Sequence, residues 1–335
     1  VMAFVAAVNI DAPIFLISLF LLVGSFFFAR WRIPSPKIQS IFASVLFRIE
    51  RAAALALRTA NMARKNWQPM VLAISLDPLE KRPFTTFLDW IAARHGLVNL
   101  CQFIPYEGDF GEVLDERAHA AGKMEDYIRI RKSHLIPDVV LTKDVSTSIL
   151  DKVQSAGYHS NTVAFAMEQG STDQAELLQP IFHDMLKVRK NILLLRYGHS
   201  VFGNNRNIYI WWSKPENGQL MVILSYILLC QKDWRDAHVT ICYIADDAKA
   251  PETERYLTDL IDNSRFQIGS LLYRGFTFDK DVGTYNIIAN NSKDADLVFL
   301  GLSEKMDIVD YMKEWDELTV DAVFVRSNGE ADLSD

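Results

Sequence analysis

Short apolar runs alternate with helical patterns from residue 69 to the end of the sequence, and no other feature constrains the fold as strongly. In the first half of this region we predict strands at 70–75, 98–104, 138–142, 162–167 and 191–197, and helices at 84–94, 111–132, 146–156 and 173–188. Strands and helices that alternate in this way favour a parallel sheet with helices on both faces. The pattern therefore predicts an α/β unit of five strands.

The second half of the region repeats this plan. We predict strands at 208–212, 239–244, 270–274, 297–302 and 322–325, and helices at 219–231, 252–263, 283–290 and 306–317. The last two strand patterns of each half resemble each other, which indicates an internal duplication, although doubly wound folds share such patterns without a common origin. We therefore expect two tandem, doubly wound α/β lobes, joined by a linker near residues 199–207.

Length and composition agree with two folded units in a reducing compartment. A chain of 335 residues exceeds one ordinary core. Half of its residues are hydrophobic and 23% are charged, which excludes collagen-like and wholly disordered chains. The three cysteines, Cys101, Cys230 and Cys242, form neither a disulfide framework nor a CxxC metal pair, so we expect buried thiols in a cytosolic body.

The run of 18 uncharged residues at 12–29 predicts a membrane-spanning helix. At helical rise this run covers about 27 Å, close to the thickness of a bilayer core. The basic residues follow the run instead of preceding it, which favours a span over a signal peptide or a buried core helix. The positive-inside rule then places the rest of the chain in the cytoplasm. The residues expected at the membrane surface are Arg30, Trp31, Arg32 and Lys37.

Residues 1–10 are also apolar, but they are too few to cross a bilayer and they begin with Val instead of Met. We expect the chain to be the carboxy-terminal part of a polytopic membrane protein. The alternative is a natural amino-terminal anchor with a ragged start.

Residues 33–66 predict an amphipathic helix that connects the membrane to the body. The charge is divided unevenly, because residues 1–65 carry +6 and the remainder carries −13. The basic charge suits anionic headgroups or an acidic protein face, and a solvated helix face is an equal alternative. An acidic body argues against nucleic acid as a partner.

The sequence contains no clear catalytic or cofactor motif. The seven histidines have no metal-ligand spacing. The glycines at 108, 111 and 122 fit neither common phosphate-loop pattern, and the segment 198–203 lacks a nucleophile elbow with an acid partner. We therefore expect a protein without enzymatic activity, resident cofactor or bound metal.

Three local strings resemble the cation-chloride cotransporter family, of the solute carrier 12 type. They are Asn66-Trp67-Gln68-Pro69, then Asn207-Ile208-Tyr209-Ile210-Trp211-Trp212 with Asn217-Gly218-Gln219-Leu220, and Lys232-Asp233-Trp234-Arg235. The family motif and candidate interface residues are Trp67, Pro69, Trp211, Trp212, Gly218 and Trp234. Trp211 and Trp212 point to opposite faces of a strand, so one indole is expected in the core and the other at an interface.

The resemblance implies the end of a transmembrane domain (1–32), the connector (33–66) and two lobes (67–199 and 200–335) similar to universal stress proteins. It implies a regulatory domain that dimerises and serves a chloride-coupled potassium or sodium symporter in the plasma membrane. The expected partners are the bilayer, the upstream transporter and a second copy. The family's ion sites lie in earlier spans, so this chain alone is not expected to transport.

Short loops between the strands suggest a prokaryotic member without inserted phosphorylation segments. The alternative function is a membrane-anchored sensor that binds adenine nucleotide, although the usual glycine signature is replaced by Gly170-Ser171. An anchored α/β enzyme is a third reading, and it lacks a catalytic constellation.

Overall fold

The computed structural model describes residues 20, 21, 24, 43–52 and 67–333, except for short gaps at 95, 156–159, 186, 199–201, 247, 267 and 304–306. The chain consists of two units, Val1–Met62 and Ala63–Asp335.

The described residues of the first unit are helical. They comprise positions 20, 21, 24 and 43–52, and their side chains are exposed. Of the connector predicted at 33–66, residues 43–52 are helical and the others lie outside the described residues. Most of the predicted span at 12–29 lies outside the described residues, as do Arg30, Trp31, Arg32 and Lys37. Within the described part of the chain, no helix combines the length and the apolar character that crossing a membrane requires.

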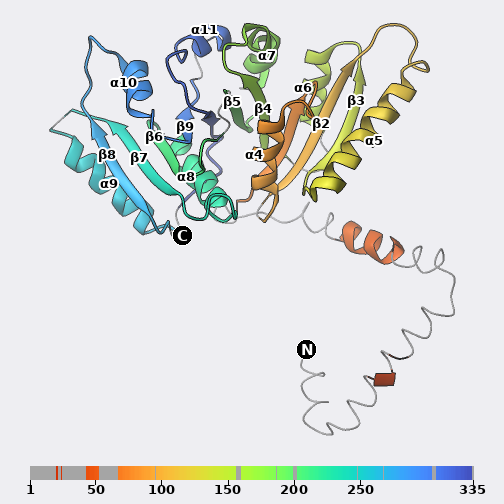
Figure 1. The fold of residues 1–335 in the computed structure, drawn as a ribbon, viewed down its shortest axis with the longest axis horizontal. Coiled ribbons are helices and arrows are strands. Elements are labelled where there is room, and N and C mark those ends of the chain that lie inside the picture. Colours follow the sequence, from red (N-terminus) through yellow and green to blue (C-terminus); the bar gives the residue numbers. More distant parts are fainter. Residues whose placement is uncertain are drawn as a thin grey trace. The chain divides into compact units, whose positions relative to one another are not determined.

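The second unit contains two lobes of alternating strands and helices (Figure 1). The first lobe comprises β1 (Met70–Ser75), α4 (Arg82–Ala92), β2 (Leu97–Pro105), α5 (Leu114–Arg131), β3 (Ile136–Thr142), α6 (Val145–Ser155), β4 (Thr162–Glu168), α7 (Thr172–Met185) and β5 (Asn191–Tyr197). The second comprises β6 (Asn207–Trp212), α8 (Pro215–Leu229), β7 (His238–Ile244), α9 (Ala250–Asp262), β8 (Leu271–Phe276), α10 (Thr284–Asn291), β9 (Leu297–Gly301), α11 (Ile308–Lys313) and β10 (Ala322–Arg326).

All ten of these strands form one continuous sheet, in the order β3-β2-β1-β4-β5-β10-β9-β6-β7-β8. Each lobe contributes five parallel strands in the same relative order, and the only antiparallel pair joins β5 to β10. The predicted tandem of doubly wound lobes is therefore confirmed, and the two lobes share one sheet.

The register of the sheet reveals an internal two-fold relation. Leu194 of β5 faces Phe324 of β10, and the pairs on either side are arranged symmetrically about this pair. The ladders within each lobe match in the same way: Ile74 pairs with Cys101 on β2, and Trp211 pairs with Cys242 on β7. The two cysteines therefore occupy equivalent positions, which supports the predicted duplication.

The two faces of the sheet bury separate apolar clusters. One cluster packs beneath α4, α5, α8 and α9, and the other packs beneath α6, α7, α10 and α11. The lobes also touch through equivalent helices, α4 with α8 and α7 with α11. Central strands are buried on both faces, which explains why their sequences are continuous apolar runs.

Polar groups at the junction of the lobes follow the same two-fold relation. The carboxylate of Asp321 accepts hydrogen bonds from the backbone N–H groups of Gly198, at 2.8 Å, and Phe202, at 2.6 Å. At the equivalent position, Oδ1 of Asn191 accepts the N–H of Asn328 at 2.8 Å. These bonds tie the segment that follows each last strand to the start of the other lobe's last strand.

Two predicted helix boundaries differ from the structure by several residues. The helix predicted at 219–231 begins at Pro215, because proline presets the backbone of a first helical position, so that Gly218 lies inside the helix. The helix predicted at 306–317 is the shorter α11, which begins after Asp307, whose side chain caps Val309 and Asp310.

Candidate functional site

A cavity of about 570 Å³ opens at the carboxyl ends of β6, β7 and β9 in the second lobe. The strand order reverses between β6 and β9, since β7 and β8 lie on one side and β10 on the other. Open α/β sheets bind ligands at such a reversal. The cavity is lined by Trp211, Trp212, Ser213, Lys214, Asn217, Ile244, Thr284, Tyr285, Ile288, Leu300, Gly301, Leu302, Ser303, Tyr311 and Trp315.

Aromatic rings form one wall of the cavity. The rings of Tyr285 and Trp315 meet edge to face with centroids 4.8 Å apart, and Trp315 also lies 5.6 Å from Phe324 of the core. The hydroxyl of Tyr311 donates to the carbonyl of Gly301 at 2.8 Å, which fixes α11 to the end of β9. The rings of this wall thus take the edge-to-face arrangement that aromatic pairs prefer.

The polar groups of the cavity are hydroxyls, an amide, indole N–H groups and one amine among its described lining residues. Among the described lining residues, Lys214 is the single charged one, and none is a histidine or a carboxylate. Burial raises the pKa of Tyr311, and it also raises the pKa of Tyr285, with a smaller contribution from Glu314. Both phenols therefore stay neutral at physiological pH and serve as hydrogen-bonding groups.

Gly301 at the end of β9 keeps the cavity open. A Cβ atom at this position would lie 2.9 Å from Oγ of Ser213 and 3.2 Å from Nδ2 of Asn217. Asn217 cannot move freely, because its Oδ1 accepts the backbone N–H of Ser327 at 2.8 Å. The glycine thus allows β9 and the start of α8 to approach each other around the cavity.

The corresponding crevice of the first lobe is crossed by a lysine. The sheet register makes Ala166 of β4 equivalent to Gly301. Nζ of Lys81, from the loop between β1 and α4, donates to the carbonyl of Ala166 at 3.3 Å. Burial lowers the pKa of Lys81, against smaller opposing effects of Asp77 and Glu168.

The three candidate residues around the second-lobe crevice are brought together. Trp211 is 3% exposed, and its Nε1 donates to Oγ of Ser292 at 2.9 Å. Trp212 is half-buried on the opposite face of the sheet, as the alternation predicts. A Cβ at Gly218 would overlap the Trp212 ring, with Cδ2 only 2.6 Å away, so the glycine makes room for the indole.

The remaining motif residues lie away from this cavity and close to the contact between the lobes. Trp67 and Pro69 are buried where the chain enters β1, and Trp234 is fully buried after α8. Trp234 packs edge to face on Trp90 of α4, with centroids 5.5 Å apart. These positions give the motif residues a structural role, and their contact with a second copy stays a prediction.

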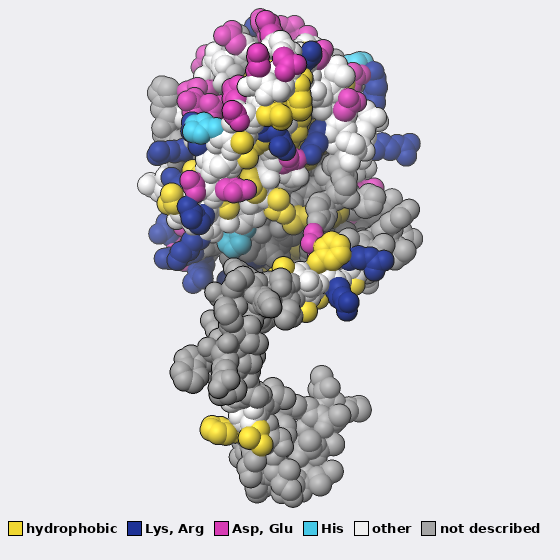
Figure 2. Space-filling view, turned by 90° about the vertical axis from the view of Figure 1, so that its right-hand side faces the viewer, with side chains coloured by type: hydrophobic (Ala, Val, Ile, Leu, Met, Phe, Trp, Pro, Cys, Tyr) yellow, Lys and Arg dark blue, Asp and Glu magenta, His cyan; other side chains and the backbone are white. Residues whose placement is uncertain are grey.

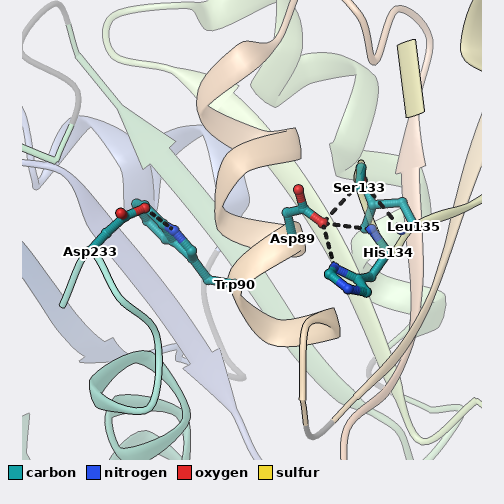
Figure 3. Close-up of polar contacts among 6 residues, drawn as sticks. All are labelled: Asp89, Trp90, Ser133, His134, Leu135 and Asp233. Carbon is teal, nitrogen blue, oxygen red and sulfur yellow. Dashed lines mark hydrogen bonds and ion pairs between the residues drawn. The ribbon is translucent and has the colours of Figure 1, made fainter. Parts of the chain in front are cut away.

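Helix α4 connects the two lobes through adjacent side chains that point in opposite directions (Figure 3). Nε1 of Trp90 donates to Asp233 of the second lobe at 2.9 Å. The carboxylate of Asp89 accepts from Oγ of Ser133 at 3.0 Å and from the backbone N–H of His134 at 2.9 Å. One helix turn therefore holds both the α5–β3 loop and the other lobe.

No sequence motif predicts the aromatic wall. Tyr285, Tyr311 and Trp315 come from α10 and from the segment around α11, and no motif joins them. The sequence did show that these residues follow two strands of the second lobe, β8 and β9. Ligands of such folds bind beyond the carboxyl ends of strands.

Comparisons with known proteins identify the fold. No protein-family model and no curated protein matches the sequence. Among solved structures, the cytoplasmic domain of a prokaryotic cation chloride cotransporter matches with a TM-score of 0.56 at 15% identity, over 79% of this chain and 97% of that chain. A universal stress protein from Archaeoglobus fulgidus DSM 4304 matches with a TM-score of 0.51 at 11% identity, over 79% and 97%. A putative universal stress protein from Pseudomonas aeruginosa UCBPP-PA14 matches with a TM-score of 0.50 at 12% identity, over 80% of this chain and 96% of that chain.

These matches confirm the predicted resemblance of the lobes to universal stress proteins as a likeness of fold. The cotransporter domain shares this fold over nearly its whole length.

Proposed function

We propose that the two lobes form the cytosolic regulatory domain of a chloride-coupled potassium or sodium symporter, and that this domain is not an enzyme. The observation that carries the proposal is the likeness to a cotransporter's cytoplasmic domain over 97% of that domain. The ordered motif strings from Trp67 to Trp234 agree with it, as does the apolar run at 12–29 that precedes a basic connector. The domain then lies on the cytoplasmic side of the plasma membrane.

The native gene product tests this proposal. We expect its intact mass, measured after extraction from membranes, to be far above the 38.2 kDa of this chain, because transport requires additional spans. In proteoliposomes it should take up rubidium or sodium, and replacing chloride with gluconate should abolish that uptake. A mass equal to that of this chain, or uptake that does not depend on chloride, contradicts the proposal.

Dimerisation is the second part of this proposal, and we assign it to the end of the sheet formed by α5 and β3. Large apolar side chains are exposed there: Phe110 (53%), Leu114 (44%), Ile130 (78%) and Ile136 (41%). Figure 2 looks onto this end and shows apolar side chains between charged ones. The partner is a second copy of this chain.

The charges of α5 support this choice of partner. The first turn of the helix carries Asp115 and Glu116, and the last turn carries Arg129 and Arg131. A two-fold axis that sets two such helices antiparallel brings the acidic end of one against the basic end of the other. Such complementarity favours association and fixes its register.

Sedimentation velocity of the full chain measures this association. We expect the wild-type chain to sediment at about twice 38.2 kDa, and Ile130→Glu to weaken the dimer by roughly tenfold or more. The matched control is Leu272→Glu, because Leu272 is half-exposed at the opposite end of the sheet, on β8. A monomeric wild-type chain, or equal effects of the two variants, would contradict dimerisation through α5 and β3.

A second function, sensing of an adenine nucleotide, is favoured by the second-lobe cavity. Its aromatic wall suits a flat ring, and Lys214 suits an anionic group. Calorimetric titration of the full chain with ATP tests this function. If the protein senses ATP, the wild-type chain should release or absorb heat on binding it, and Gly301→Ala should abolish this heat. Gly122→Ala, at an open position of α5, should bind ATP like the wild type. No heat at millimolar ATP contradicts it.

A further inference from the structure

The segment that supplies part of the aromatic wall of the second-lobe cavity also contacts the first lobe. Residues 308–318 comprise α11 and the turns between it and β10. Tyr311 and Trp315 of this segment are buried and line the cavity. Helix α11 lies beside α7 of the first lobe (Figure 1), and both belong to one apolar cluster, to which α7 contributes Ile181 and Phe182. The wall of a second-lobe cavity therefore shares a core with a first-lobe helix.

Side chains of the first lobe hydrogen-bond to the backbone of this segment at both of its ends. At the start of the segment, Oε1 of Gln179 on α7 accepts the N–H of Ile308 at 2.8 Å. At its end, the guanidinium of Arg196 on β5 donates to the carbonyl of Trp315 at 3.0 Å and to the carbonyl of Leu318. The first lobe thus holds the segment on either side of the two lining aromatic residues.

The bonds at the end of the segment come from a buried cation. Arg196 is buried, so the carbonyls that it reaches replace water as acceptors for its guanidinium. Hydrogen bonds from a charged donor are stronger than those between neutral groups. Nε2 of Gln169, which follows β4, donates to the same Leu318 carbonyl at 3.3 Å. The position of the segment therefore depends on β4 and β5 as well as on the second lobe.

We propose that the first lobe positions the aromatic wall of the second-lobe cavity, with Gln179 and Arg196 as the positioning residues. A change at the junction of the lobes then moves Trp315 relative to Tyr285 and alters the affinity of the cavity for its ligand. The coupling is reciprocal, so a ligand in the cavity also favours one arrangement of the junction. The effect on affinity rests on the proposed binding function of this cavity, whereas the positioning of the wall does not.

The indole N–H signals of the ligand-free full chain test the positioning. Trp315→Phe and Trp211→Phe assign two signals from the cavity by their loss. We expect Gln179→Leu to shift the Trp315 signal, because α11 loses its bond to the first lobe. The Trp211 signal should not shift, since Trp211 lines the same cavity from β6 and its Nε1 donates to Ser292 of the second lobe.

Gln102→Leu is the matched control. Gln102 is a half-buried glutamine of the first lobe, like Gln179, and its Nε2 donates to the carbonyl of Leu76 at 3.1 Å. This bond stays within the first lobe and does not reach the wall. The control variant should therefore leave the signals of Trp315 and Trp211 unchanged.

Arg196→Lys is the second test variant, because it keeps the buried charge and removes the guanidinium. It should shift the Trp315 signal in the same way as Gln179→Leu. An unchanged Trp315 signal in both variants overturns the proposal. An equal shift of the Trp234 signal also overturns it, because Trp234 belongs to the apolar cluster on the opposite face of the sheet and reports on the fold as a whole.

Calorimetric titration of the full chain with ATP tests the consequence for binding. We expect Gln179→Leu to weaken ATP binding about fivefold, which corresponds to one net hydrogen bond, and Gln102→Leu to bind like the wild type. Equal affinities of all three proteins overturn the coupling between the junction and the ligand. No heat with the wild type contradicts nucleotide sensing instead, and the indole signals then decide whether the first lobe positions the wall.

Discussion

The two lobes share one strand order but differ at the crevice where their central strands end. In the first lobe a six-residue loop, 76–81, separates β1 from α4, and it delivers Lys81 across the crevice to Ala166. In the second lobe only Ser213 and Lys214 separate β6 from α8, and a cavity of about 570 Å³ remains. The two crevices therefore differ in the length of the loop that follows their first strand and in the side chain that this loop places there.

The junction of the lobes, by contrast, retains its symmetry. Arg196 and Arg326 occupy equivalent positions on β5 and β10, and burial lowers the pKa of both, to about 10 for Arg196. Asn191 and Asp321 likewise occupy equivalent positions and accept equivalent backbone hydrogen bonds. Residues at equivalent positions of the junction are thus similar in the two lobes, whereas the residues at the two crevices differ.

Gly218→Ala should reduce stability more than the other variants, because it disrupts the packing of Gly218 against Trp212 in the second lobe. The added Cβ overlaps the ring of Trp212, so we expect the free energy of unfolding to fall by about 3 kcal/mol in urea denaturation. Gly122→Ala in α5 is the control. No atom lies within 4 Å of its Cβ, and this variant should gain up to about 1 kcal/mol. Equal gains in both variants would contradict the overlap.

Asp321→Ala and Asn191→Ala compare the two halves of the junction. The first leaves two backbone N–H groups without acceptors and should cost about 2 kcal/mol. The second leaves one such group and should cost less.

The pH dependence of stability separates these two variants further. Burial raises the pKa of Asp321 above 3.8, although its hydrogen bonds and Arg196 oppose the shift. The native state therefore binds the extra proton, and stability should fall as pH rises from 3.8 through the folded-state pKa. Asp321→Ala should remove this component of the pH profile, whereas Asn191→Ala should retain it. Unfolding curves recorded between pH 3 and 7 check the difference.

Trp90→Phe should have a smaller effect, because it removes the single hydrogen bond from α4 to Asp233 and preserves most of the ring. We expect a loss of about 1 kcal/mol in thermal or urea unfolding. Ser133→Ala, which removes a bond within the first lobe, is the matched control. If the Trp90–Asp233 bond couples the two lobes, Trp90→Phe should make them unfold in two separate transitions, whereas Ser133→Ala should leave a single transition.

Thiol reactivity should show no difference between the lobes. Burial raises the pKa of Cys101 and of Cys242 to about 12, with smaller effects of neighbouring charges. Both thiols should therefore resist a disulfide reagent at pH 8 in the folded chain and react only after unfolding. A count of reactive thiols before and after unfolding checks this. Reaction of Cys101 but not of Cys242 in the folded chain would show that the two positions are not equivalent. The Cys230→Ser variant removes the third, less buried thiol from the count.

The order of helices and strands was predictable because buried parallel strands leave continuous apolar runs, such as Ile192 to Leu195. The shared sheet was not predictable. Pairing of β5 with β10 depends on contacts between residues far apart in the sequence, and apolar periodicity carries no information about a strand's neighbour.

The candidate site was predictable only in part. Trp212 and Gly218 stood out as an unusual local string, and they do pack together. Tyr285 and Trp315 are separated by 30 residues of sequence and meet only because α10 and the segment after α11 fold over the same edge. Lys81 gave no sequence signal, since a lysine before a helix is ordinarily solvated.

The entry point of the chain has a mechanical consequence. Trp67, which precedes β1, belongs to the same buried apolar cluster as Ile223 and Ile227 of α8, so the entry to the first lobe shares a core with a helix of the second. A displacement of Trp67 would therefore disturb the packing of both lobes at once, instead of that of the first lobe alone.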